Sequence, residues 1–171
     1  MKRILVLLLC VMLLFGGCAD NTVELPLSRP DDFAIYYRWG YSSANFFDTY
    51  EGKIGKDLIT AGSAESALAV SEEMLDEIYA LIVEYDIASI KVEMTSENLA
   101  NLWESRYDMI PCASYEIRFR ADGTEYTVIG DATAEGYKKG ENFCAFVDEM
   151  TELVRSTPEY LAFPEAEGGY M

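Results

Sequence analysis

The fold of this chain is decided by the stretch Ser114-Tyr115-Glu116-Ile117-Arg118-Phe119-Arg120, followed by the turn Ala121-Asp122-Gly123. Aromatic and aliphatic side chains alternate with charged ones in it, a period of two that is typical of a half-buried β-strand. Because the Asp-Gly pair tolerates the positive φ angles of a tight hairpin, Glu125–Ile129 is expected to return as the paired strand. The stretch therefore predicts an antiparallel sheet that is wet on one face.

Further strands are expected around this hairpin, because other short segments rich in β-branched and aromatic residues are bounded by turn residues. They are Phe33–Trp39, Asn45–Tyr50, a weaker strand around Ile54–Thr60 and a short one over Ile87–Glu93. The small, polar segment Ala61–Ala69 is expected to be a connection.

Two segments carry apolar residues at helical spacing, Ser71–Tyr85 and Glu141–Arg155. Ser71 can cap the first of them, and Pro158 limits the second. Their apolar stripes need a surface to cover, and the apolar face of the sheet provides one. The expected fold class is α+β: a two-layer sandwich in which an antiparallel sheet of about five strands carries two amphipathic helices on one face.

The N-terminus has the pattern of a bacterial export signal. Lys2 and Arg3 are basic, and Ile4–Phe15 is apolar throughout. The segment Phe15-Gly16-Gly17-Cys18 then has the small residues of a signal-peptide cleavage site. The apolar run is shorter than the roughly 20 residues that a membrane-spanning helix needs, and an ordinary N-terminal core helix is the alternative. The stretch resembles the lipobox of bacterial lipoproteins, although Phe15 stands where Leu or Val is usual.

This resemblance implies a lipid anchor. Residues 1–17 would be the signal peptide, Cys18 would carry a diacylglycerol, and the protein would be held at the extracytoplasmic face of a bacterial membrane. Residues 18–31 are then expected to form a tether, and 32–171 a single α+β domain with an irregular C-terminal tail.

The body of the chain is also similar to uncharacterised bacterial lipoprotein domains. The residues that carry this similarity are the Trp39-Gly40 turn, the helix start Ser71-Glu72-Glu73 and the Ala121-Asp122-Gly123 hairpin. The similarity implies a fold and no activity.

The net charge of the chain limits the classes of partner that it is expected to bind. The chain has 13 Lys and Arg against 30 Asp and Glu, a formal net charge of −17. Such a surface repels phosphodiester polymers, so nucleic acid is not expected as a partner. A cationic protein or peptide remains possible, and solubility alone is the simpler explanation of the acidity.

Catalytic chemistry has little support. The chain contains no histidine, which excludes Ser-His and Cys-His pairs and imidazole-bound zinc. Phosphate-binding loops and the common acyl-enzyme motifs are missing too. We therefore expect no catalytic residue, no metal and no cofactor, although a pair of carboxylates could still serve a small hydrolase.

Two groups of residues are candidate sites. Arg38, Arg118 and Arg120 are expected to share the wet face of the sheet, and Lys56 is a further candidate for the same face. There they could bind a carboxylate or a sugar acid. The alternative is cross-strand pairing with Glu116 and Glu125.

Cys112 and Cys144 form the second group. Outside the cytoplasm they could form a disulfide, and the alternative is a pair of free, buried thiols.

The function expected from the sequence is a lipid-anchored, non-enzymatic binding or interaction module. The alternatives are a small carboxylate-dependent hydrolase acting on an envelope or extracellular polymer, and a structural accessory subunit of an envelope complex.

Overall fold

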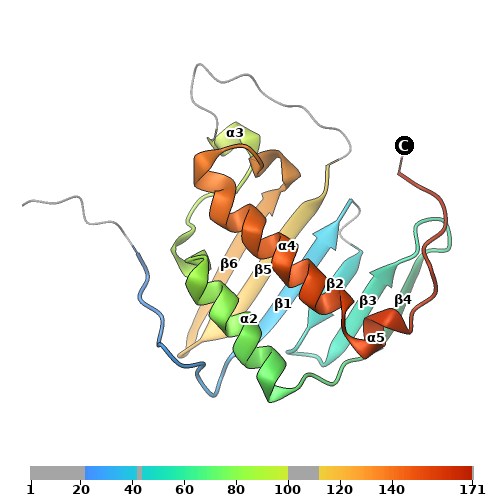
Figure 1. Cartoon of the computed structure of the whole chain (residues 1–171), viewed down its shortest axis with the longest axis horizontal. Helices are drawn as coiled ribbons and strands as arrows, with labels where there is room; N and C mark the ends of the chain where they lie inside the picture. The colour runs from blue at the N-terminus through green and yellow to red at the C-terminus, as the bar shows by residue number, and fades with distance from the viewer. Residues whose placement is uncertain (1–21, 42–43, 100–111, 171) are drawn as a thin grey trace, which may run out of the picture.

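The fold is built on a six-stranded antiparallel sheet with the strand order β4-β3-β2-β1-β5-β6 (Figure 1). A computed structural model describes residues 22–41, 44–99 and 112–170 of the chain. The strands are β1 (Ala34–Gly40), β2 (Asn45–Asp48), β3 (Lys53–Asp57), β4 (Ser63–Ala67), β5 (Ser114–Ala121) and β6 (Thr124–Asp131). The α-helices are α2 (Glu72–Glu84), α3 (Ser96–Leu99), α4 (Glu141–Arg155) and α5 (Pro158–Leu161). The α+β class expected from the sequence is confirmed.

The hairpin predicted over Ser114–Ile129 is confirmed. Strands β5 and β6 pair from Ser114 opposite Asp131 to Ala121 opposite Thr124. Asp122 and Gly123 both take positive φ angles, 50° and 73°, which a tight hairpin turn requires. Strand β1 pairs with the other side of β5, so the hairpin forms one edge of the sheet.

The expected number of about five strands is wrong, because β4 adds an edge strand inside the segment predicted to be a connection. Its residues alternate between exposed and half-buried, and most of its side chains are small. Such a strand has no apolar period for sequence reasoning to detect. Pairing with β3, from Lys53 opposite Ala67 to Asp57 opposite Ser63, holds it in place.

The short strand predicted over Ile87–Glu93 is also wrong. Asp86 adopts a left-handed conformation directly after α2, and Ile87–Ser89 form a 3-10 turn, η1, that buries Ile87. The chain reaches the β6 edge only at Met94, which accepts from Asp131 N at 3.0 Å and donates to Ile129 O at 2.9 Å. Ile87 and Ala88 therefore fill the core instead of extending the sheet.

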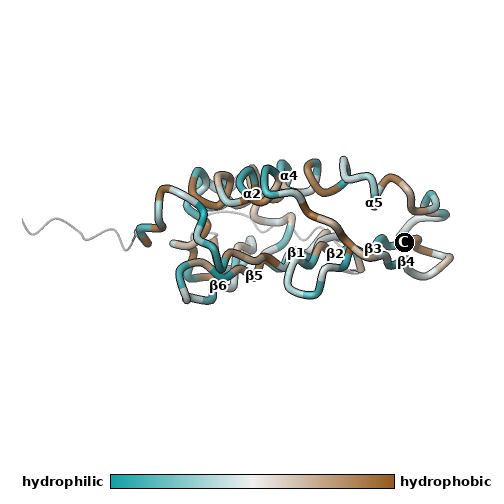
Figure 2. The backbone as a smooth tube through the Cα atoms, turned by 90° about the horizontal axis from the view of Figure 1, so that it is seen from below, coloured by the Kyte–Doolittle hydropathy of each residue, from teal (hydrophilic) through white to brown (hydrophobic). Residues whose placement is uncertain are grey.

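Helices α2, α4 and α5 lie along one side of the sheet (Figure 2). The core between them and the strands contains the fully buried side chains of Ile35, Tyr37, Phe47, Ile78, Ile82, Ile117, Phe119, Phe143, Phe146 and Met150. The Tyr37 hydroxyl also donates to Val147 O at 3.1 Å and lies 2.7 Å from Thr151 Oγ1, which fixes α4 above β1.

The C-terminal tail was expected to be irregular, but part of it forms helix α5. Thr157 caps α5 by accepting from Tyr160 N at 3.3 Å, and Pro158 occupies the first turn, where its missing N–H is no loss. Beyond α5, Glu167 exchanges backbone hydrogen bonds with Leu58 and Thr60 after β3. The tail is thereby fixed beside the end of the sheet.

The described part of the predicted tether lies against the domain. Val23 N donates to Ser89 Oγ at 2.7 Å, and the Tyr79 hydroxyl donates to Pro26 O at 2.7 Å. Arg29 binds Glu72 and also Asp76, the latter at 2.6 Å from its Nε. An intrachain cation thus offsets the repulsion between these two carboxylates, one turn apart on α2. Of the helices in the described ranges, none combines the length and the apolar character that crossing a membrane requires.

Candidate functional site

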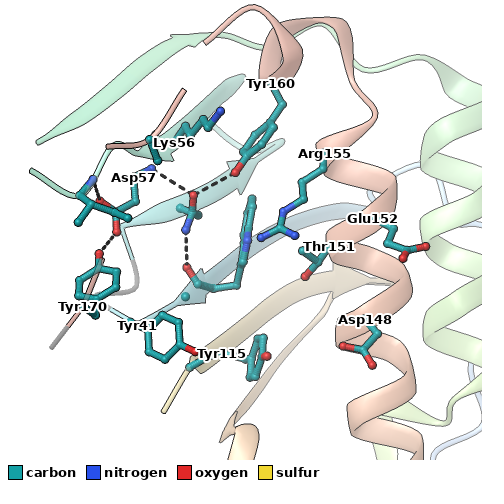
Figure 3. Close-up of a pocket in the computed structure, with 16 residues that line it drawn as sticks. Tyr41, Lys56, Asp57, Tyr115, Asp148, Thr151, Glu152, Arg155, Tyr160 and Tyr170 are labelled. Carbon is teal, nitrogen blue, oxygen red and sulfur yellow. Dashed lines mark hydrogen bonds between the residues drawn. The ribbon is translucent and has the colours of Figure 1, made fainter. Parts of the chain in front are cut away.

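A pocket of about 590 Å³ opens where the last turns of α4 face the ends of β1 and β3 (Figure 3). The C-terminal tail contributes to one side of it. Its aromatic lining comes from distant parts of the chain and comprises Trp39, Tyr41, Tyr115, Tyr160 and Tyr170. Ligand sites are typically concave and lined by aromatic side chains around a few polar groups.

Trp39 contributes a buried donor to this pocket. Its side chain is stacked on Tyr37, with ring centroids 5.1 Å apart, and lies 6.0 Å from the ring of Tyr160. The residue is only 2% exposed, and within the described chain its Nε1 has no hydrogen-bond partner. A buried donor left unsatisfied costs about 1–3 kcal/mol, so natural proteins rarely keep one without a reason.

Two cations lie near the same aromatic ring. Lys56 Nζ is 5.2 Å from the centre of the Tyr160 ring, and Arg155, in the last turn of α4, lines the pocket beside it. Burial raises the pKa of the Tyr160 hydroxyl, and the charge of Arg155 opposes that rise. As far as the described residues go, neither cation is in a salt bridge with a carboxylate.

Asn45 holds these groups in position. Its Nδ2 donates to Trp39 O at 3.2 Å. Its Oδ1 accepts from Asp57 N at 3.1 Å and from the Tyr160 hydroxyl at 3.2 Å. One side chain at the start of β2 therefore links the end of β1, the end of β3 and helix α5.

Carboxylates lie at the margins of the pocket. Asp57 accepts from Ile59 N at 2.9 Å and also from the hydroxyl of Tyr170. Figure 3 shows Glu152 pointing away from Tyr160 and Lys56. Asp148 lies nearer Tyr115, where burial and, secondly, the charge of Asp148 raise the pKa of the phenol to about 12. The carboxylates thus lie at the margins of the pocket, and Lys56 and Arg155 lie beside Tyr160.

None of these pocket residues was predicted as a site, apart from Lys56, which was placed on the wrong face. The period of two puts Lys56 on the same side as the buried Ile54, toward the helices. The one available sequence signal was Trp39, an aromatic residue on the apolar face where its strand ends.

The arginine face predicted from the sequence lies on the opposite side of the sheet. Strand register places Arg118 opposite Tyr36 and Arg38 opposite Glu116. Arg118 Nε lies 3.1 Å from Glu116 Oε1, and its guanidinium lies 4.1 Å from the centre of the Tyr36 ring. A shallow hollow of about 320 Å³ adjoins Arg118.

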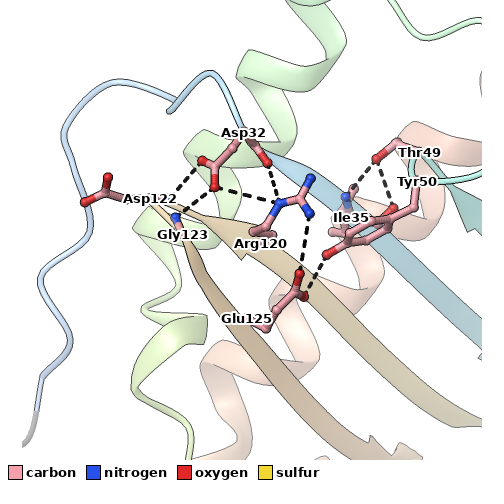
Figure 4. Close-up of polar contacts among 8 residues, drawn as sticks. All are labelled: Asp32, Ile35, Thr49, Tyr50, Arg120, Asp122, Gly123 and Glu125. Carbon is pink, nitrogen blue, oxygen red and sulfur yellow. Dashed lines mark hydrogen bonds and ion pairs between the residues drawn. The ribbon is translucent and has the colours of Figure 1, made fainter.

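Arg120 is engaged in the structure of the hairpin (Figure 4). Its Nε donates to Asp32 O at 3.1 Å, and its Nη1 lies 3.9 Å from Glu125 Oε1. The three arginines therefore share one face, and Arg118 and Arg120 meet the acids that the pairing alternative named.

The two cysteines are free thiols in the structure, and both are half-buried. Cys112 lies just before β5, and Cys144 lies in the first turn of α4. Burial raises the pKa of Cys112, and it raises that of Cys144 to about 11. The disulfide between them stays a prediction, and Cys18 lies outside the described residues.

Comparison with protein-family models, with curated proteins and with solved structures gives no match. In the ranges that the structure describes, no group of three or more acidic or cysteine side chains is placed to hold a metal ion. The geometry of the pocket therefore has to indicate which ligands it can bind.

Proposed function

We propose that this chain is a lipid-anchored, non-enzymatic binding protein on the extracytoplasmic face of a bacterial membrane, and that its ligand occupies the pocket at Trp39. The observation that carries the proposal is the buried indole N–H of Trp39 in the wall of a pocket of about 590 Å³, a donor that has no hydrogen-bond partner among the described residues. An acceptor on a bound ligand would satisfy it. In this proposal the fold is a two-layer sandwich, with the pocket between its layers at one end.

The proposed anchor would hold the domain near the lipid surface. Contacts with the domain begin at Val23. The residues from Cys18 to Val23 can span at most about 17 Å, at about 3.3 Å each. The segment expected to act as a tether is thus packed along α2 over most of its described length.

The anchor is tested by Cys18→Ala in intact cells, with Cys112→Ala as the matched control. We expect the Cys18 variant to leave the membrane fraction and to lack the mass of the acyl chains, because two chains supply stable anchoring. The control should stay membrane-bound. Equal membrane retention of the two variants would refute the anchor.

A carboxylate-dependent hydrolase is the second candidate, because Asp57, Asp148 and Glu152 line the same pocket. A glycosidase needs two carboxyl groups on either side of the scissile bond, one of them held protonated. Here Asp148 and Glu152 are exposed on the polar side of α4, and Asp57 already accepts two hydrogen bonds. This placement supports binding over hydrolysis. Recovery of a bound saccharide in cleaved form, lost in Asp148→Asn, would favour the hydrolase.

A further inference from the structure

This inference rests on the proposed binding function and names the chemistry of the ligand. We infer that the pocket at Trp39 binds a sugar acid, a saccharide unit that bears a carboxylate. Its carboxylate would lie against Arg155, Lys56 and the indole N–H of Trp39, and its ring would lie toward Tyr41 and Tyr170.

The donor end of the pocket selects a carboxylate. Arg155 presents a planar fork of N–H groups that matches a carboxylate in two parallel hydrogen bonds. Lys56 adds a second positive charge, 5.2 Å from the centre of the Tyr160 ring. Both cations are without a carboxylate partner among the described residues. A cationic ligand would be repelled at this end, and a carboxylate would be attracted to both positive charges.

The rim of the pocket suits a ring with hydroxyl groups. Tyr41 is 54% exposed and Tyr170 40% exposed, and their rings lie 5.3 Å apart with a tilt of 38°. Exposed tyrosines offer a flat apolar face together with a polar edge. Asp148 and Glu152, on α4, are acceptors for hydroxyl donors.

A sugar acid fits this mixture of charges better than a simple anion does. Three carboxylates and two cations line the pocket, so phosphate, with about two negative charges, would gain at Arg155 and lose near Asp148 and Glu152. A sugar acid carries one negative charge at one end and only hydroxyl donors at the other.

The test is NMR titration of the full-length chain, purified in a mild detergent, with D-glucuronate as the probe. The chain has two tryptophans, so Trp39→Phe assigns the indole N–H signal of Trp39, and Trp103 serves as the internal reference. We expect glucuronate to shift the Trp39 signal downfield in a saturable manner, with a Kd of about 1 mM or tighter. D-glucose, which has the ring without the carboxylate, should give a much smaller shift.

Arg155→Gln should weaken glucuronate binding about tenfold, because it removes one charge-assisted interaction. The matched control, Arg118→Gln, changes an arginine on the opposite face of the sheet and should leave the affinity unchanged.

Three results would overturn the inference: no saturable shift with glucuronate, equal shifts with glucose or inorganic phosphate, or equal losses in the two arginine variants. Equal shifts with glucose would still leave the pocket as a binding site. A lost anchor in the Cys18 experiment would remove the membrane assignment without affecting the titration. The two proposals can therefore fail separately.

Discussion

Asp32 shows how one side chain outside the sheet fixes the hairpin that defines it. Its Oδ1 accepts from Asp122 N at 2.9 Å and its Oδ2 from Gly123 N at 2.8 Å (Figure 4). Sequence reasoning recognised the Asp-Gly turn from its tolerance of positive φ. It did not find Asp32, because the partners of this carboxylate lie about 90 positions further along the chain.

These hydrogen bonds make a pH-dependent contribution to stability. The bond from Gly123 N is the main reason why the pKa of Asp32 lies below its usual value. A carboxyl with a lower pKa in the folded state stabilises the fold above its unfolded pKa of about 3.9, and the effect is lost as the pH falls through the folded value. We expect Asp32→Ala to lower the urea midpoint at pH 7, and the difference from the parent chain to shrink as the pH falls below the unfolded pKa of about 3.9.

Asp31→Ala is the control for this experiment, because Asp31 is the exposed neighbour. It should change the midpoint little at either pH. If the stability lost in Asp32→Ala does not shrink as the pH falls below about 3.9, the ionised carboxylate is not what holds the turn.

At the scale of elements, sequence periodicity predicted the strands and helices whose apolar faces form the core. The alternation in β1 and β5 and the helical stripes of α2 and α4 were detected, because each places large apolar side chains on one face. Strand β4 was missed, since an edge strand of small residues needs no apolar face.

Strand β6 contains a glycine that packing requires. A Cβ atom built on Gly130 would lie 2.5 Å from Phe143 Cζ and 2.7 Å from Met94 O. The contact with a backbone oxygen cannot be relieved by a side-chain rotation. We therefore expect Gly130→Ala to destabilise the fold by about 1–3 kcal/mol, as overpacking usually does.

Urea unfolding of Gly130→Ala beside Gly169→Ala provides the measurement. A Cβ on Gly169 would meet nothing within 4 Å, so this control should unfold at the parent concentration. If the two variants unfold at the same urea concentration, the close approach of β6, Phe143 and Met94 is not a constraint on the fold.

At the scale of the whole molecule, the pocket could not be predicted from the sequence. Its lining runs from Trp39 to Tyr170 and depends on how α4, α5 and the tail pack against the sheet end. No local pattern specifies that arrangement. The composition, in contrast, directly gives one property of the whole chain, its excess of negative charge.

This excess should make stability depend on salt. The chain has 30 acidic and 13 basic residues, and the ion pairs seen among described residues engage Arg29, Arg118 and Arg120. Repulsion between the remaining carboxylates destabilises the compact state. Raising NaCl from about 10 mM to about 1 M shortens the Debye length from about 30 Å to about 3 Å, which screens that repulsion. We expect the melting temperature at pH 7 to rise by several degrees, about 2–4 °C for each kcal/mol gained.

Choline chloride should act like NaCl, which separates screening from binding of a particular cation. In Glu77→Lys, which breaks the repulsion with Glu73 one turn away on α2, the melting temperature should be higher at low salt and should rise less as salt is added. A melting temperature that falls with salt would mean that favourable ion pairs, and not repulsion, dominate the electrostatic free energy of folding.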